Sequence, residues 1–220
     1  GRDGALLPFW KPDGRSIAFF AQSKLKRIEI DTGGVQNLAD ATLTPSGGTW
    51  NRDGVILFSA GIGRGIQRVS DTGGDATQLI ADGVAPKFLA DGRRFLYQAG
   101  GRFETYVGSL EGMEPRQILD ATSVYPVSGT LFYVRQGKLF SQEFDSEKLA
   151  LAGNPTVVAD SVAISSAGSV ASVTISATGV IAYRASLAPR RLVWFDRSGK
   201  ETGTFHVGGF SPTVSDDHRF

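Results

Sequence analysis

The sequence contains no cysteine, two histidines and a single methionine. The lack of cysteine excludes disulfide bonds, cysteine-ligated zinc and cysteine nucleophiles. Two histidines without any cysteine cannot supply the usual tetrahedral ligand set of a transition metal. No Asp-x-Asp-x-Asp-Gly loop for calcium occurs either. We therefore predict that this chain holds neither a metal nor a cofactor.

Excess charge of one sign and long apolar runs are also missing. Lys and Arg number 23 against 22 Asp and Glu, so the formal net charge is +1 at pH 7. This balance gives no electrostatic reason to expect a nucleic-acid partner or an anionic membrane. The longest apolar runs are a few residues long, far below the roughly 20 that span a bilayer. With 41% hydrophobic residues, the composition is that of a folded globular protein, without a membrane segment in this chain.

Glycine is abundant, with 28 residues, and many of the glycines recur at regular intervals. The tetrapeptide Asp-Thr-Gly-Gly occurs at Asp31–Gly34 and again 40 residues later at Asp71–Gly74. Asp-Gly pairs and single glycines mark the same spacing, at Asp13-Gly14, Asp53-Gly54, Asp91-Gly92, Gly129 and Gly179. The steps between these glycines are 40, 38, 37 and 50 residues. A period of about 40 residues is typical of propeller blades.

Each repeat consists of short strands separated by turns. An aromatic or apolar residue lies four positions before each landmark, at Trp10, Trp50, Phe88, Tyr125, Ile175 and Val214. Asp-Gly between two β-rich runs is a strong hairpin signal because glycine accepts a positive φ, and a turn aspartate bonds its own backbone amides. We therefore predict that Asp13, Gly14, Asp53, Gly54, Asp91 and Gly92 are structural turn residues. No window of 11 residues has the apolar stripe of a helix.

Four antiparallel strands in each unit predict an all-β protein, a β-propeller of four-stranded antiparallel blades. We expect five full blades and the opening of a sixth, at approximately 5–43, 44–82, 83–121, 122–160, 170–207 and 208–220. The segment Leu149–Ser172, which breaks the period, is expected to be a longer connection between blades or, as the alternative, a loop that contacts a ligand. Propellers protect their edges by closing the ring, and the sixth blade is interrupted at Phe220. We therefore expect an incomplete ring, as in a piece of a longer protein.

The repeats carry a family resemblance. The segment Trp10-Lys11-Pro12-Asp13-Gly14-Arg15, followed by Ile17-Ala18-Phe19, resembles the Trp-Ser-Pro-Asp-Gly signature of TolB-like, WD-repeat-like bacterial propellers. The Asp-Thr-Gly-Gly turns fit the same family. Residues 50–58 and 192–200 look like the propeller region that follows the kinase domain and membrane segment of bacterial receptor-like serine/threonine kinases. This resemblance implies an extracytoplasmic or periplasmic sensor domain of a membrane-anchored parent. Because Val127-Ser128-Gly129 lacks the Pro-Asp pair, and His218 stands in place of a glycine, no shared ligand follows for the repeated positions.

Motifs for catalysis are missing from the sequence. His206 falls in an expected outer strand and His218 in an expected turn, so neither is placed to complete a Ser-His-Asp triad. Gly61-Ile62-Gly63-Arg64-Gly65 lacks the Lys-Ser/Thr ending of a phosphate loop, and no His-Arg-Asp or Asp-Phe-Gly kinase motif occurs. From these absences we predict that the segment has no catalytic residue and is not an enzyme, with any kinase or hydrolase domain elsewhere in the parent chain.

Three functional hypotheses follow. The first is a propeller that recognises a protein, a peptide or a small ligand at the mouth of its axial channel, as the sensor region of a larger receptor. Trp10, Trp50, Phe88 and Tyr125 are then candidates for lining the channel mouth, although they equally suit the layers between blades. The second is the accessory propeller of a prolyl-oligopeptidase-like serine peptidase, with its hydrolase domain outside this segment. The third is a propeller lactonase, which requires a cluster of polar residues in the channel.

Overall fold

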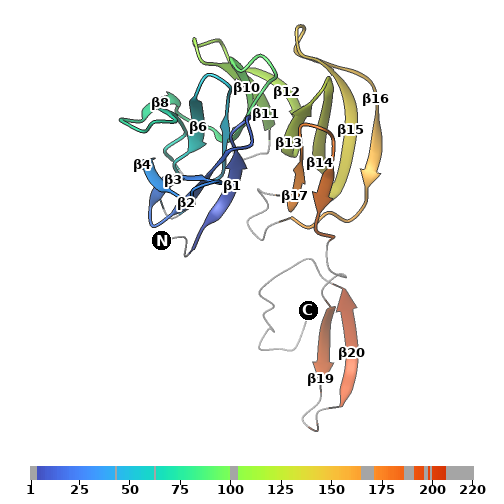
Figure 1. Cartoon of the computed structure of the whole chain (residues 1–220). Helices are drawn as coiled ribbons and strands as arrows, with labels where there is room; N and C mark the ends of the chain where they lie inside the picture. The colour runs from blue at the N-terminus through green and yellow to red at the C-terminus, as the bar shows by residue number, and fades with distance from the viewer. Residues whose placement is uncertain are drawn as a thin grey trace.

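Strands are the only regular elements in the described part of this computed structural model, and the four-stranded antiparallel sheets that they form stand side by side (Figure 1). The structure describes residues 4–42, 44–61, 63–99, 104–164, 171–185, 191–195, 198 and 200–206. Four of the sheets have four strands in sequence order. The prediction of an all-β propeller is therefore confirmed. Within the described residues, no helix is long and apolar enough to cross a membrane.

The first two blades follow the predicted hairpin order. Blade 1 contains β1 (Leu6–Trp10), β2 (Ser16–Ala21), β3 (Lys24–Glu29) and β4 (Val35–Asp40). Blade 2 contains β5 (Gly48–Trp50), β6 (Val55–Ser59), β7 (Ile66–Ser70) and β8 (Thr77–Ile80). Gly61, Gly63 and Gly65 of the glycine-rich segment lie in the β6–β7 hairpin connection, as the sequence indicates.

The next two blades have the same strand order. Blade 3 contains β9 (Val84–Phe88), β10 (Arg94–Ala99), β11 (Glu104–Ser109) and β12 (Arg116–Asp120). Blade 4 contains β13 (Thr122–Val127), β14 (Thr130–Arg135), β15 (Lys138–Asp145) and β16 (Ala150–Ala159). The first strands of successive blades contact one another, β1 with β5, β5 with β9 and β9 with β13. These first strands therefore form the inner layer of the propeller.

The fifth expected blade differs from the prediction. Its strands form two separate two-stranded sheets, one of β17 (Val173–Ile175) and β18 (Ile181–Tyr183), the other of β19 (Arg191–Phe195) and β20 (Glu201–His206). The inner strand β17 contacts β13, so this hairpin continues the inner layer. The expected sixth blade, 208–220, lies outside the described residues.

Much of the segment 149–172 is strand rather than connection. The ten-residue β16 pairs with β15 from Asp145↔Ala150 to Leu139↔Ala159. One of the two register shifts in this ladder accommodates Gly153, Asn154 and Pro155, which an outer strand tolerates because one of its edges faces solvent. The long step in the sequence therefore reflects an extended outer hairpin as well as the link to β17.

The core lies between blades, in four apolar layers. One layer joins blades 1 and 2 through residues such as Phe20 and Phe58, and the next joins blades 2 and 3 through Leu57 and Phe95. The third joins blades 3 and 4, and the fourth joins blade 4 to the β17–β18 hairpin. Strands between two layers bury both faces, which explains the nearly continuous apolar runs of β6 and β10.

One face of blade 1 is left uncovered. The register aligns Trp10, Ile17, Ile28 and Val35 in a row across its four strands. Trp10 is 59% exposed and Val35 is 43% exposed. The corresponding residues of blade 2, Trp50, Ile56 and Val69, are buried in the layer between blades 1 and 2. Blade 1 therefore presents to solvent a row that blade 2 buries.

We expect this row to make the chain associate with a second copy of itself. Exposed apolar sheet faces drive association, so light scattering should show a mass that rises with protein concentration. Val35→Lys should lower that mass toward the monomer, whereas Val157→Lys on the exposed outer strand β16 should not. A concentration-independent monomer of the unmodified chain would contradict this expectation.

Candidate functional site: the inner strands

The inner strands share an irregularity at one end. In blades 1 to 4 a residue with positive φ precedes or interrupts the inner strand, namely Leu7 (49°), Gly47 (93°), Ala85 (52°) and Ser123 (58°). The pairing of β1, β9 and β13 with their neighbours shifts register at the same place. Bulges of this kind unpair backbone groups and are frequent next to binding sites, and a non-glycine residue at positive φ stores strain. This bulged end of the inner strands is the candidate site.

The bulges also reveal a slip in the sequence alignment of blade 4. The turn glycine follows the bulge residue by seven positions in blades 1 to 3, but by six in blade 4, from Ser123 to Gly129. A slip of one residue moves a strand side chain to the opposite face of its sheet. Tyr125 is therefore not equivalent to Trp10, Trp50 and Phe88, contrary to the constant register expected from the sequence. It corresponds to Phe9, Thr49 and Lys87.

The aromatic candidates consequently lie in different environments. Trp50 is buried between blades 1 and 2, and Phe88 packs between blades 2 and 3. Tyr125 packs on the other side of its own blade, against the β17–β18 hairpin. Trp10 lies on the uncovered face of blade 1. The four residues do not come together as one aromatic surface.

The residues two positions after the bulge each contact the next inner strand. The ring of Phe9 packs so closely on Gly48 that a Cβ there would lie 2.6 Å from the ring. Thr49 Oγ1 accepts a hydrogen bond of 3.2 Å from the backbone N–H of Phe88. Lys87 Nζ lies 5.5 Å from the centre of the Tyr125 ring, and the Tyr125 hydroxyl donates to the Val173 carbonyl at 2.7 Å. Lys87 is the single cation in this set.

Lys87 differs from Lys11, which also lies over an aromatic ring. Lys11 Nζ lies 5.4 Å from the Trp50 ring centre and forms ion pairs with Asp71 at 3.2 Å and Asp13 at 3.5 Å. Among the described residues, no carboxylate pairs with Lys87. Burial lowers the pKa of Lys87 to about 8 and raises that of Tyr125 to about 12. At neutral pH the ammonium of Lys87 therefore lies in the inner layer without a carboxylate partner among the residues that the structure describes.

The predicted turns lie at the edge of the inner strands. Gly14, Gly54 and Gly92 have φ of 71°, 77° and 68°. Asp13 accepts from the Arg15 N–H at 2.9 Å, and Asp91 accepts from the Arg93 and Arg94 N–H groups. These bonds to the charged carboxylate lower the pKa of Asp13 below its ordinary value. A shallow pocket of about 180 Å³ lies beside these turns, lined by Lys11, Pro12, Asp13 and Arg52.

In blade 2 the turn is held by a residue that the sequence analysis missed. Asn51 is 3% exposed, and its Oδ1 accepts from the N–H groups of Asp53 and Val55. Its Nδ2 donates to the Gly92 carbonyl of blade 3 at 2.8 Å. Asn51 therefore takes the role that the Asp-Gly pattern suggests for Asp53, and it also joins two blades. The sequence did offer a signal for this role, because asparagine readily forms turns of this kind and Asn51 lies just before the Asp53-Gly54 pair.

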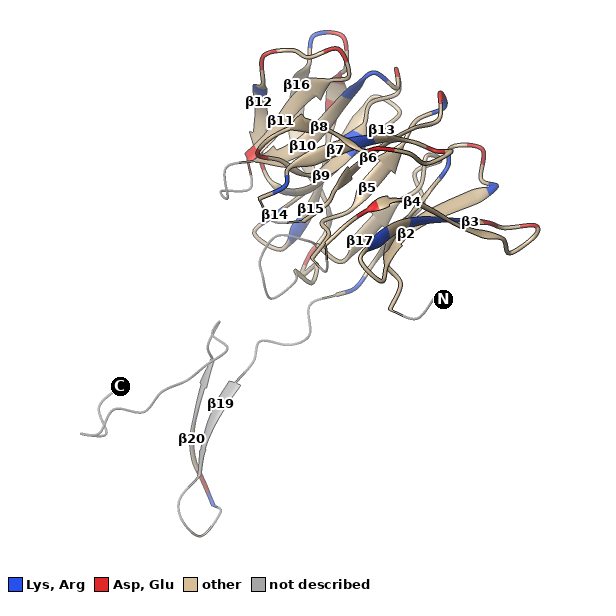
Figure 2. Cartoon of the chain, turned by 90° about the vertical axis from the view of Figure 1, so that its left-hand side faces the viewer, with Lys and Arg blue, Asp and Glu red and all other residues tan. Residues whose placement is uncertain are grey.

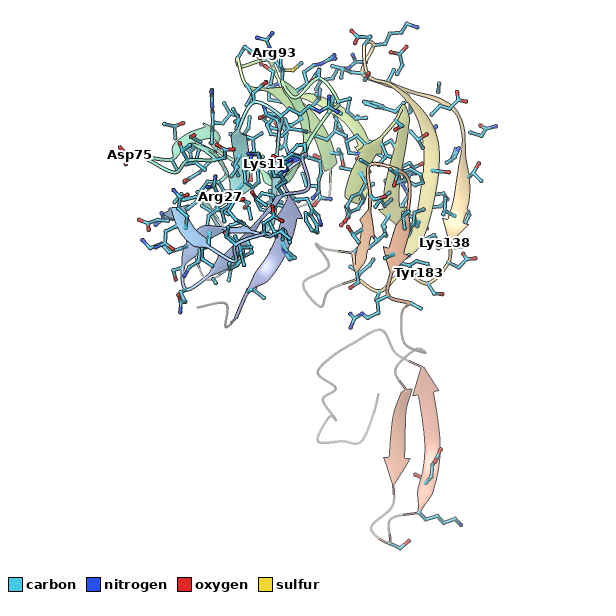
Figure 3. The ribbon with its side chains drawn as sticks, in the orientation of Figure 1. Lys11, Arg27, Asp75, Arg93, Lys138 and Tyr183 are labelled. Atoms are coloured by element: carbon cyan, nitrogen blue, oxygen red, sulfur yellow. The ribbon has the colours of Figure 1, made fainter. Side chains whose placement is uncertain are left out.

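The Asp-Thr-Gly-Gly turn of blade 2 (Asp71–Gly74) is bonded to side chains of blade 1. Lys11 and Arg27 extend from blade 1 toward it (Figure 3). Arg27 donates to the Asp71 carbonyl and Gln36 donates to the Thr72 carbonyl, both at 2.8 Å. Figure 2 shows acidic and basic residues interspersed along such turns. The charges therefore serve local pairing rather than a surface of one sign.

The histidines contribute no described site. His206 ends β20 and His218 lies outside the described residues. Within the part of the chain that the structure describes, no three His, Cys, Asp or Glu side chains gather closely enough to hold a metal ion.

Comparison with known proteins identifies the fold and no closer relationship. No protein-family model and no curated protein sequence matches the chain. TolB from Acinetobacter baumannii is 16% identical with a TM-score of 0.62, over 84% of this chain and 53% of that one. Regucalcin from Agrobacterium tumefaciens, a calcium-binding protein, is 16% identical with a TM-score of 0.58, over 93% and 75%. Virginiamycin B lyase from Staphylococcus aureus is 16% identical with a TM-score of 0.51, over 70% and 54%.

The comparisons contradict the prediction that the segment is not an enzyme. Proteins of this fold include virginiamycin B lyase, streptogramin B lyase and a luciferin-regenerating enzyme. A propeller can collect functional residues from several blades, so missing linear motifs do not exclude catalysis. At 10–16% identity, these similarities assign no reaction to this chain. They do identify it as a β-propeller with TolB-like structural neighbours.

Proposed function

We propose that this propeller recognises a peptide or a small ligand at the bulged end of its inner strands. The observation that carries the proposal is the alignment of the positive-φ residues Leu7, Gly47, Ala85 and Ser123 in four successive blades. In blades 1, 3 and 4 the ladder shifts register beside this residue, and a bulge takes backbone groups out of the ladder, where a ligand can bond to them. Strained backbone persists where the surrounding structure imposes it, and such strain is concentrated at binding sites.

We further propose that the propeller is the extracytoplasmic interaction domain of a larger bacterial, kinase-linked receptor. The support is the resemblance of residues 50–58 and 192–200 to propellers of receptor-like kinases, together with a TolB neighbour of the same fold. The flanking sequence of the parent polypeptide tests this part. A kinase domain and an apolar stretch of about 20 residues upstream would support it, whereas a hydrolase domain downstream would instead favour the accessory propeller of a peptidase.

A binding screen tests the recognition site itself. Short peptides and small organic anions would be screened by thermal shift, and each hit would be titrated and assayed for turnover. We expect saturable binding that Ala85→Gln weakens, because the longer side chain would fill the bulged end of β9. Glu111→Gln, in the exposed β11–β12 turn, is the matched control and should bind as the unmodified chain does. Binding that ignores Ala85→Gln would place the site elsewhere.

A further inference from the structure

We propose that Lys87 is the anchor for a carboxylate group of the ligand, at the same inner-strand site; this inference rests on the proposed function. The position is exceptional within the repeat. Its equivalents Phe9, Thr49 and Tyr125 are neutral, and each contacts the next inner strand through packing or a neutral hydrogen bond. Lys87 places an ammonium group at that point instead.

The ammonium has a ring beneath it and no anion beside it. Its Nζ lies 5.5 Å from the Tyr125 ring centre, an attraction that offsets only part of the cost of burying a charge. The facing titratable group is the Tyr125 hydroxyl, which is bonded to the Val173 carbonyl and stays neutral well above pH 7. The described part of the chain supplies no ion-pair partner for Lys87. A ligand carboxylate would supply the missing counter-charge.

Lys11 is the internal comparison. It has the same arrangement of an ammonium over an aromatic ring, but Asp13 and Asp71 already neutralise it. An added anion would have to displace these carboxylates, so Lys11 should not bind one. The aromatic ring of Tyr125 beside Lys87 also suits a ligand whose carboxylate is attached to an apolar or aromatic body. Benzoate is therefore a suitable probe, with acetate and inorganic phosphate as comparisons.

The first measurement is the pKa of Lys87, determined by NMR of its side chain in the full chain with and without benzoate. A bound anion stabilises the ammonium form, so we expect benzoate to raise this pKa and to bind progressively more weakly above pH 8. The pKa of Lys11 should not change. Acetate should act more weakly than benzoate, and an equal effect of phosphate would show that any anion suffices and would overturn the carboxylate assignment.

The second measurement separates binding from stability. Lys87→Met should lose about tenfold or more of the benzoate affinity, and Lys87→Arg should retain most of it. Because the folded-state pKa is depressed, the unfolded chain binds more protons between pH 8 and 10.5, and burial of Lys87 is destabilising below that window. Lys87→Met should therefore melt at a higher temperature than the unmodified chain at pH 7, with the difference shrinking from pH 8 to 10.5.

The outcomes distinguish this inference from the proposed function. If Lys87→Met binds benzoate as tightly as the unmodified chain, or the pKa of Lys87 does not respond to benzoate, the anchor is overturned. A peptide or neutral ligand that binds in a manner sensitive to Ala85→Gln would then still support the inner-strand site. If no ligand responds to Ala85→Gln either, both proposals fail.

Discussion

Replacing Gly54 with valine should lower the free energy of unfolding by about 2–4 kcal/mol, since a β-branched residue is strained at positive φ and also collides here. Gly54 has φ of 77°, and a Cβ at this position would lie 3.0 Å from the Asp71 carboxylate. That carboxylate pairs with Lys11 of blade 1. The substitution therefore strains the turn and also disturbs an ion pair between two blades. Chemical denaturation would measure the loss.

Gly14→Val provides the matched control. Gly14 has nearly the same φ, 71°, but no atom lies within 4 Å of a Cβ at that position. Only the backbone strain should appear, about 1–2 kcal/mol. Equal losses for the two variants would show that the Asp71 contact has no energetic role. A loss below about half a kcal/mol in both would show that the turn conformation is wrong.

Replacing Asn51 with alanine should cost about 2–4 kcal/mol, because it removes three hydrogen bonds to backbone groups, each contributing about 0.5–1.5 kcal/mol. The amide oxygen accepts hydrogen bonds from the Asp53 and Val55 N–H groups, and the amide nitrogen donates one to the Gly92 carbonyl of the next blade. We also expect the denaturant dependence of unfolding to change, since this residue couples blades 2 and 3. Equilibrium denaturation followed by tryptophan fluorescence would measure both effects.

Asn37→Ala is the corresponding control. Asn37 lies on the exposed strand β4, where substitutions usually change stability by less than about 0.5 kcal/mol. If Asn51→Ala costs no more than Asn37→Ala, the link between blades 2 and 3 does not depend on the amide.

The repeated turns made the fold predictable, whereas the faces of individual strands were less so. Asp-Gly and Asp-Thr-Gly-Gly in phase identify the hairpins of blades 1 to 3, because positive φ restricts the residues allowed there. In blade 4, Ser128 and Gly129 both have positive φ and close a tight two-residue turn between Val127 and Thr130. Gly129 follows the bulge residue Ser123 by one position fewer than the turn glycines of blades 1 to 3 do. Counting back four positions from Gly129 therefore places Tyr125 on the wrong face of its strand.

The candidate site was harder to predict from the sequence than the fold, because its main features depend on contacts between residues that lie far apart in the chain. Positive φ at Leu7, Ala85 and Ser123 has no residue signature, since none of these is glycine. Lys87 reads as an ordinary strand lysine until the adjacent blade places the Tyr125 ring beside it. The fifth blade shows a related limit. Its strands are recognisable locally, but their pairing into one sheet is a long-range property, and the structure has two separate sheets.

The amide chemical shifts of the 15N-labelled chain during a benzoate titration test the central claim most directly. If ligands bind at the bulged end of the inner strands, saturable shifts should be concentrated around Ala85–Phe88 and Ser123–Tyr125, with smaller changes near Leu7 and Gly47. They should be lost in Lys87→Met. Saturable shifts confined to the outer strands β4, β8, β12 and β16, or no saturable shift at any residue, would contradict the binding of a carboxylate ligand at this site.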